Sequence, residues 1–164
     1  MPSFEIEHKF LIKKPSEDML LSLHNIRVLN ISQTYTTLGA RARKIEENGK
    51  TTYIKTVKKH ITNLVRIEDE QEITKAEYDQ MLSAKMDGTV TLNKTRYVYP
   101  YKNKKIEIDV FPFWQNQAFL EVELENENDE FFLPPFIEVI KEITDDKSYR
   151  NFSLSKKIPK EEIF

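Results

Sequence analysis

The stretch FEIEHKFLI, residues 4–12, alternates between two kinds of side chain in the manner of a β-strand. One face of such a strand would carry Phe4, Ile6, His8, Phe10 and Ile12, and the other would carry Glu5, Glu7 and Lys9. Antiparallel strands alternate in this way because one face meets the core and the other meets water. A solvent-exposed charged face is the simplest interpretation of one such strand, so a functional interpretation depends on whether the pattern repeats.

The composition is that of a folded chain without cysteine chemistry. Of its 164 residues, 39% are hydrophobic and 32% are charged, and the length predicts one domain over residues 1–164 with a sizeable core. A net charge of −2 argues against nonspecific nucleic-acid binding. The absence of cysteine excludes disulfides, thiolate metal sites and cysteine nucleophiles. No basic segment precedes an apolar run at the N-terminus and no stretch reaches membrane-spanning length, which predicts a cytoplasmic protein.

Strands dominate the secondary structure that the sequence predicts. Residue alternation predicts them at 4–12, 28–38, 40–46, 51–58, 65–73, 94–101, 104–111 and 118–126. An Asn-Gly pair at 48–49 favours a tight hairpin. Helices are predicted at 15–26, which begins with Pro-Ser, and at 74–86, where Thr74 and Glu77 have capping-box spacing. These elements predict a mainly β, α+β fold built on an antiparallel sheet, and such a sheet could close into a barrel.

Charges recur in pairs or series along the later strands. The sets are Arg41 with Arg43, Lys55 with Lys58, Arg66 with Glu68, Glu70 and Glu72, Lys94 with Arg96, Glu107 with Asp109, and Glu121 with Glu123 and Glu125. Exposed ion pairs stabilise a fold by only ~0 to 1 kcal/mol each, so a surface network gives little physical reason for such order. We infer instead that the apolar faces pack outward and the charged faces line a water-filled lumen. Such a lumen suits a polyphosphate with divalent metals, because cationic side chains bind phosphate oxygens and carboxylates bind hard cations.

The order of these motifs resembles that of the CYTH superfamily, the triphosphate tunnel metalloenzymes. Its members include class IV adenylyl cyclases, thiamine triphosphatases and inorganic tripolyphosphatases. The N-terminal Glu5-x-Glu7-x-Lys9 resembles the ExExK signature of this superfamily, and EITDDKSYRN, residues 142–151, resembles its closing segment. The resemblance implies an eight-stranded antiparallel β-barrel, a tunnel with a charged lumen and a few helices packed outside.

The resemblance also implies roles for individual residues. The implied catalytic residues are Glu5, Glu7, Lys9, Arg41 and Arg43. The implied triphosphate-binding residues are Lys9, Arg41, Arg43, Lys58, Lys94 and Arg96. Lys58 matches the family signature and Lys55 is a second candidate; the two differ in strand parity, so both would face the lumen only if a bulge lay between them. The implied ligands of Mg²⁺ or Mn²⁺ are Glu5, Glu7, Glu121 and Glu123, with Glu70, Glu72 and Asp109 as further metal ligands.

The function expected from these residues is metal-dependent hydrolysis of a small triphosphate, first of all inorganic tripolyphosphate. An adenylyl cyclase and a thiamine triphosphatase are the enzymatic alternatives, and a polyphosphate-binding protein without turnover is the non-enzymatic one. The sequence identifies no nucleobase pocket, and its three histidines and three glycines form neither a zinc motif nor a phosphate-binding loop. The expected partner is the small triphosphate, without a specific nucleic acid or a membrane, and a homodimer is left open.

Overall fold

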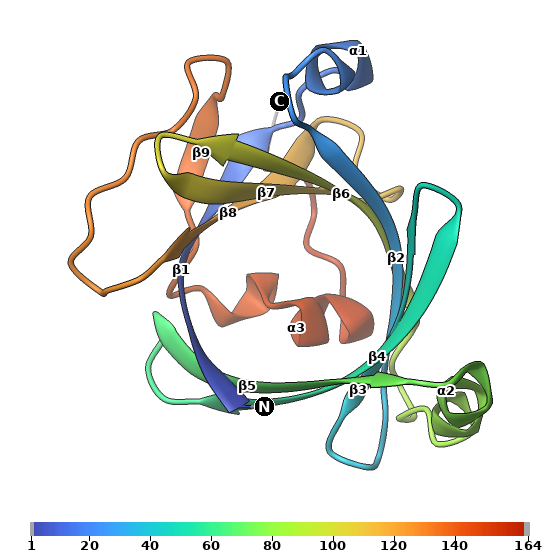
Figure 1. Ribbon diagram of the computed structural model, residues 1–164. Helices are drawn as coiled ribbons and strands as arrows, with labels where there is room; N and C mark the ends of the chain where they lie inside the picture. The colour runs from blue at the N-terminus through green and yellow to red at the C-terminus, as the bar shows by residue number, and fades with distance from the viewer. Residues whose placement is uncertain (1, 163–164) are drawn as a thin grey trace.

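The strands of the protein form a closed antiparallel barrel (Figure 1). The computed structural model describes residues 2–162. Its strands are β1 (Pro2–Lys13), β2 (Arg27–Tyr35), β3 (Arg41–Glu47), β4 (Lys50–His60), β5 (Val65–Ile73), β6 (Leu92–Tyr101), β7 (Lys104–Val110), β8 (Gln117–Leu124) and β9 (Val139–Glu142). Their order is β5-β4-β3-β2-β6-β7-β8-β1-β9, and a further pairing of β5 with β1 closes the first eight into a ring. The predicted eight-stranded antiparallel barrel is confirmed, with β9 as an added strand beside β1.

The helices are few and short. They are α1 (Glu17–Leu21), α2 (Lys75–Leu82), the 3₁₀ helix η1 (Lys147–Tyr149) and α3 (Asn151–Lys156). The capping box predicted for the second helix is present, since the backbone N–H of Glu77 donates to Oγ1 of Thr74 and that of Thr74 donates to Oε1 of Glu77. The helix predicted at 15–26 is limited to α1, which ends at its C-cap Ser22, and the chain then adopts a positive φ of 61° at Asn25. No helix within residues 2–162 is long and apolar enough to span a membrane.

The hairpin between β3 and β4 forms at the predicted Asn-Gly pair. Asn48 and Gly49 have φ angles of 51° and 78°. Positive φ at both central residues is the requirement of a type I′ turn, whose twist matches that of the flanking strands. The neighbouring strand β2 ends at Tyr35, three residues before the predicted end, where the chain turns through Gly39 with a φ of 72°.

Side chains of the barrel alternate between an outer core and the lumen. On β8, Leu120 and Val122 are fully buried in an apolar cluster, whereas Glu121 between them lines the lumen. Leu20 of α1 and apolar side chains of the segment 131–137 cover this cluster from outside. The apolar faces therefore pack outward and the charged faces point inward, as the alternation of the sequence predicts.

Apolar side chains fill one end of the lumen. Leu11 and Phe119 have the same inward parity as the charged residues of β1 and β8, and both are completely buried. They pack in one cluster with Trp114, Tyr149 and Leu154, so η1 and α3 close this end of the barrel. Figure 1 shows α3 lying across the ring. The sequence predicted neither α3 nor β9, because both are too short to show a clear residue period.

This closure predicts a large loss of stability when α3 loses its buried leucine. We expect Leu154→Ala to reduce the free energy of unfolding by about 2–5 kcal/mol, because Leu154 has no exposed surface and its truncation leaves a cavity. Equilibrium unfolding in urea measures the change. Leu21→Ala is the matched control, since Leu21 is 50% exposed. Equal losses in the two variants would contradict a packed role for α3.

Candidate functional site

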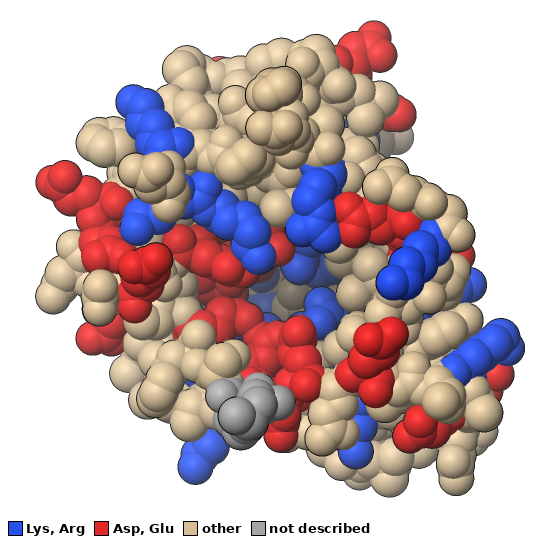
Figure 2. Space-filling view, viewed as in Figure 1, with Lys and Arg blue, Asp and Glu red and all other residues tan. Residues whose placement is uncertain are grey.

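The lumen contains a cavity of about 730 Å³, and half of the residues that line it are charged. Figure 2 shows basic and acidic side chains side by side around this hollow. The basic residues that line it are Lys9, Arg27, Arg41, Arg43, Lys58, Arg66, Arg96, Lys105 and Arg150. The acidic residues that line it are Glu5, Glu7, Glu68, Glu70, Glu107, Glu121, Glu123 and Asp146. The cavity therefore brings together charged side chains from all eight strands of the closed barrel.

Most of the residues singled out in the sequence reach this cavity. Those that do are Glu5, Glu7, Lys9, Arg41, Arg43, Lys58, Glu70, Arg96, Glu121 and Glu123. Each lies on the inward face of its strand, which the alternation of the sequence specified. The structure establishes their place, and their catalytic, phosphate-binding and metal-binding roles stay predictions.

Lys94 and Asp109 have inward parity but lie deeper than the cavity. Lys94 is 4% exposed and Asp109 is 1% exposed, and neither lines the cavity. Nζ of Lys94 lies 2.9 Å from Oδ2 of Asp109. The same carboxylate accepts hydrogen bonds from Nε and Nη2 of Arg96 at 2.8 and 2.9 Å. The pair thus holds the Arg96 guanidinium in place from below. Neither Lys94 nor Asp109 lies where it could contact a ligand in the cavity directly.

Lys55 and Glu72 are not brought to the cavity. Lys55 is paired across the sheet with Ala42, which packs outside the barrel against α2, so Lys55 has the outward parity. The register of β4 with β5 continues without a bulge, and only Lys58 of the two lysines points inward. Glu72 shares the parity of Glu70 but is exposed beyond the cavity lining. We therefore leave both residues out of the candidate site.

Several lining residues had no role in the sequence-based prediction. Arg66, Glu68 and Glu107 belong to the charged series on β5 and β7, so strand parity was a sufficient signal for them. Lys105 lies near a strand end, and Arg150 lies in the C-terminal segment before α3. No residue period marks these two positions, and only the fold brings them to the cavity.

Three buried carboxylates form an acidic cluster on one side of the cavity. Oxygen atoms of Glu7, Glu107 and Glu121 all lie within 4.8 Å of one another, and each residue is 7% exposed. Burial, with the charges of Glu121 and Glu5, raises the pKa of Glu7 well above its ordinary value. Burial also raises the pKa of Glu107 to about 7. Burial likewise acts to raise the pKa of Glu121, but the positive charges of Lys9, Arg96 and Lys94 together outweigh it, and the pKa is lowered.

This acidic cluster fits a divalent metal ion. Carboxylates that burial and mutual repulsion keep from being ionised all at once are a donor set that a hard cation can occupy. Two of its members, Glu7 and Glu121, were predicted as metal ligands, and Glu107 is added by the structure. Glu5 and Glu123 lie outside the cluster, where they pair with Lys58 at 3.2 Å and Lys105 at 3.3 Å.

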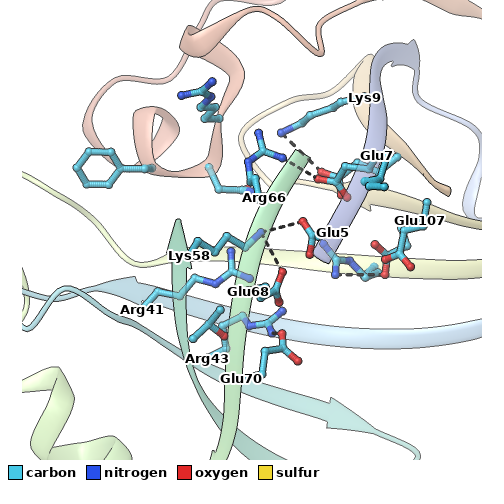
Figure 3. A pocket seen from close by; sticks show the side chains of 18 of the residues that line it. Glu5, Glu7, Lys9, Arg41, Arg43, Lys58, Arg66, Glu68, Glu70 and Glu107 are labelled. Carbon is cyan, nitrogen blue, oxygen red and sulfur yellow. Dashed lines mark hydrogen bonds and ion pairs between the residues drawn. The ribbon is translucent and has the colours of Figure 1, made fainter. Parts of the chain in front are cut away.

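The opposite side of the cavity carries crowded cations (Figure 3). Nζ of Lys58 lies between Glu5 and Glu68, at 3.2 and 3.5 Å. Arg43 pairs with Glu70, yet burial and the neighbouring Arg41 lower the pKa of Arg43 to about 10. Cations held this close repel one another, so a bound polyanion would relieve the repulsion.

The comparisons with known proteins agree with this geometry. The family model for the CYTH domain matches residues 3–144. The crystal structure of the inorganic triphosphatase NE1496 is 26% identical and has a TM-score of 0.58, with 95% of this chain and 97% of that chain covered. No curated protein sequence matches the chain.

Two further solved structures share the fold at lower identity. PH1819 from Pyrococcus horikoshii OT3 is 21% identical with a TM-score of 0.54, covering 76% of this chain and 80% of that chain. A putative adenylate cyclase (bh2851) from Bacillus halodurans is 15% identical with a TM-score of 0.52, covering 77% of this chain and 83% of that chain. At these identities the likeness concerns the fold alone.

The raised pKa of Glu107 predicts how its replacement changes stability with pH. Between pH 4.5 and about 7 the folded chain holds a proton on Glu107 that the unfolded chain has lost. The stability that this proton contributes is present below pH 4.5 and is lost as pH rises through about 7. Glu107→Gln does not titrate, so its stability relative to the natural chain should rise by about 1–3 kcal/mol between pH 5 and 8.

Urea unfolding in EDTA at both pH values measures this difference. Glu127→Gln, at an exposed position outside the cavity, is the control and should show the same stability difference at pH 5 and pH 8. A pH-independent difference for Glu107→Gln would show that Glu107 does not hold this proton.

Proposed function

The chain belongs to the CYTH domain family, and from this premise we propose that it hydrolyses a small triphosphate, preferably inorganic tripolyphosphate, with Mg²⁺ or Mn²⁺. The observation that carries the proposal is one cavity with a buried acidic cluster on one side and crowded cations on the other. The similarity to NE1496, which is named as an inorganic triphosphatase, supports the same reaction.

The triphosphate would be bound by the cations that line the cavity. Arg41 and Arg43 come from the same face of β3, so their guanidinium groups can each bind phosphate oxygens in a bidentate manner. Lys58 on the adjacent strand adds a point charge to this side. Lys58 and Arg43 are paired with carboxylates in the structure, so phosphate oxygens would replace partners that the side chains already have.

The acidic cluster would hold the divalent ion, whose charge would neutralise the phosphate oxygens as negative charge develops in the transition state. Arg96 is fixed by Asp109 and by Glu107, whose Oε2 lies 3.3 Å from Nη1, so its guanidinium can stabilise the same charge without rearrangement. Glu5 uses Oε1 to accept a hydrogen bond from Lys58, which leaves Oε2 to orient a water molecule and accept its proton. These roles require no covalent intermediate with the protein.

An organic triphosphate is the second candidate substrate. The end of the cavity near α3 includes Tyr35 and Phe152, whose rings meet edge to face at 5.1 Å, and Met86 lines the same cavity. An apolar surface of this kind can accommodate the base of ATP or the rings of thiamine triphosphate. ATP would then be converted to cyclic AMP and pyrophosphate by an adenylyl cyclase, or an organic triphosphate would be hydrolysed.

One set of incubations separates these functions. The purified chain is incubated with tripolyphosphate, ATP and thiamine triphosphate, each with Mg²⁺ or Mn²⁺, and the products are separated by anion exchange. We expect fastest phosphate release from tripolyphosphate. Cyclic AMP as the dominant product from ATP would contradict hydrolysis. Tight binding of tripolyphosphate without phosphate release would favour a binding protein.

Variants on the two sides of the cavity should have different kinetic effects. Glu121→Gln removes a charge from the acidic cluster while the cations remain, so we expect kcat to fall by about 100-fold or more with tripolyphosphate still bound. Arg41→Ala removes a bidentate phosphate donor, so we expect KM to rise about tenfold. Initial rates of phosphate release measure both constants. The assignment of the two sides fails if both variants keep the natural kcat and KM.

The two lysines of β4 provide a matched pair of substitutions. Lys58→Ala removes a cation from the cavity, whereas Lys55→Ala removes one from the outer face of the same strand. We expect Lys58→Ala to lower kcat/KM by about tenfold or more and Lys55→Ala to leave it within about twofold. Equal effects of the two substitutions would mean that a general change of charge, rather than the lumen, determines activity.

A further inference from the structure

Residues 157–162 follow α3 without regular secondary structure, and hydrogen bonds fasten them to the closed end of the barrel. The backbone N–H of Asn116 donates to Oε1 of Glu161, and the backbone N–H of Glu162 donates to Oε1 of Gln117 at 2.9 Å. Both partners lie where β8 begins. We call residues 157–162 the C-terminal strap. It has no part in the proposed hydrolysis, so its fastening needs a separate explanation.

The carboxylate of Glu162 accepts a hydrogen bond from a buried tyrosine. Oη of Tyr149 donates to Oε1 of Glu162 at 2.8 Å, and Nζ of Lys141 donates to the same oxygen at 2.9 Å. Tyr149 is 3% exposed, and its ring packs in one apolar cluster with Trp114 and Phe119. Burial and the bond to Glu162 raise the pKa of Tyr149, so its hydroxyl stays protonated and donates. The strap thus supplies the polar partner that this hydroxyl needs beside an apolar cluster.

The backbone of the same tyrosine binds a lysine of the cavity. Nζ of Lys9 donates to the carbonyl of Tyr149 at 2.9 Å and lies 4.0 Å from the centre of the Phe119 ring. Oε1 of Glu121 lies farther from this ammonium, at 3.7 Å, which is longer than a hydrogen-bonded ion pair. The carbonyl of η1 therefore holds the ammonium short of direct contact with Glu121, a member of the acidic cluster.

The position of Lys9 determines how freely Glu121 can bind a cation. An ammonium in direct contact with a carboxylate competes with a metal ion for the same oxygens, because both bind them through opposite charge. Without its bond to Tyr149, the ammonium of Lys9 could approach Glu121 and form that contact. A divalent ion would then have to displace it, and metal binding would be weaker.

We propose that Tyr149 and Glu162 are positioning residues for the divalent metal: they hold η1 so that its carbonyl binds Lys9 and leaves Glu121 available to the ion. The proposal rests on the proposed function, because it assumes a metal ion at the acidic cluster. It gives the C-terminal strap a role in metal affinity, although no residue of the strap lines the cavity.

The experiment measures Mn²⁺ binding by electron paramagnetic resonance, which distinguishes free from bound Mn²⁺ without turnover. Tyr149→Phe keeps the ring and removes the hydroxyl that donates to Glu162. We expect it to weaken Mn²⁺ binding by about 3- to 10-fold, because coupling through one hydrogen bond transmits about the net free energy of that bond. Glu162→Ala should give a similar loss. Glu162→Gln, whose amide oxygen still accepts from the hydroxyl, should keep most of the affinity.

A matched variant of the strap tests whether a general loss of stability explains the result. Glu161→Ala removes the neighbouring carboxylate, whose partner is Asn116 rather than Tyr149, and should lower the melting temperature while Mn²⁺ affinity stays within about twofold. Melting temperatures show that each variant is folded. Equal losses of affinity in Glu161→Ala and Glu162→Ala, or an unchanged affinity in Tyr149→Phe, would overturn the proposal.

A second background tests whether Lys9 transmits the effect. A chain with Lys9→Met has no ammonium to position, so adding Tyr149→Phe should change its Mn²⁺ affinity by less than about twofold. A loss as large as in the natural background would show that Tyr149 acts by another route and would also overturn the proposal.

Failure of the proposed function gives a different result. A natural chain that binds Mn²⁺ but releases no phosphate from tripolyphosphate would contradict hydrolysis, while the comparison of variants would still decide the roles of Tyr149 and Glu162. A natural chain that binds no Mn²⁺ would contradict both proposals. Normal Mn²⁺ affinity of Tyr149→Phe, in a natural chain that does hydrolyse tripolyphosphate, would contradict the positioning role alone.

Discussion

The pairing of β1 with β5 is the constraint on which the rest of the structure depends. β5 and β1 are the first and the eighth strand in the order of the sheet, and antiparallel pairs from Pro2↔Asp69 to Ile6↔Val65 join them. Once the ring is closed, every second side chain of each strand points into the same lumen. Glu5 and Glu7 are then confined with the arginines of β3, although the two strands are far apart in the sequence. The closed barrel thus turns a residue alternation into a concentrated array of charges.

The free protein tolerates this array by distributing opposite charges and by excluding water from one end. Lys58 lies between two glutamates, and Arg66 lies 3.3 Å from Glu7. At the closed end Phe119 and Trp114 pack at 5.1 Å, with ring planes 78° apart, and supply the apolar burial that a charged lumen cannot. The division of one lumen into a packed end and a charged cavity explains how the same inward faces can supply apolar burial at one end and a concentrated array of charges at the other.

Strand parity could be predicted from the sequence because it depends only on neighbouring residues. Parity predicts that Lys55 and Lys58 lie on opposite faces of β4, and the resemblance to the family favours Lys58, which lines the cavity, over Lys55, which does not. Depth along the barrel could not be predicted in this way. Lys94 has the same inward parity as Arg96 but is buried below it, because the stagger of the strands and the packing of distant aromatic rings determine where the cavity ends.

In the C-terminal part of the site, the sequence showed only that residues 142–151 resemble the closing segment of the family, and it did not predict where this segment lies in the fold. Residues 139–156 contain only short elements, and their positions depend on contacts with the barrel. One such contact is the hydrogen bond from Lys9 to the carbonyl of Tyr149, and another is the bond from Arg150 to Asn63. Such contacts join residues more than 80 positions apart, so no local pattern in the chain records them.

The ion pairs of the free protein also imply that metal and polyanion would assist each other's binding. Glu7 pairs with Arg66, and Glu121 lies 3.7 Å from Lys9. A divalent ion bound by these carboxylates would weaken both ion pairs. Cations released in this way carry more uncompensated charge toward phosphate oxygens. Linkage requires the converse, that bound phosphate frees carboxylates for the metal. The ion pairs of the lumen would therefore act as interchangeable partners, which keep the charged groups in the positions where a metal and a phosphate could replace them.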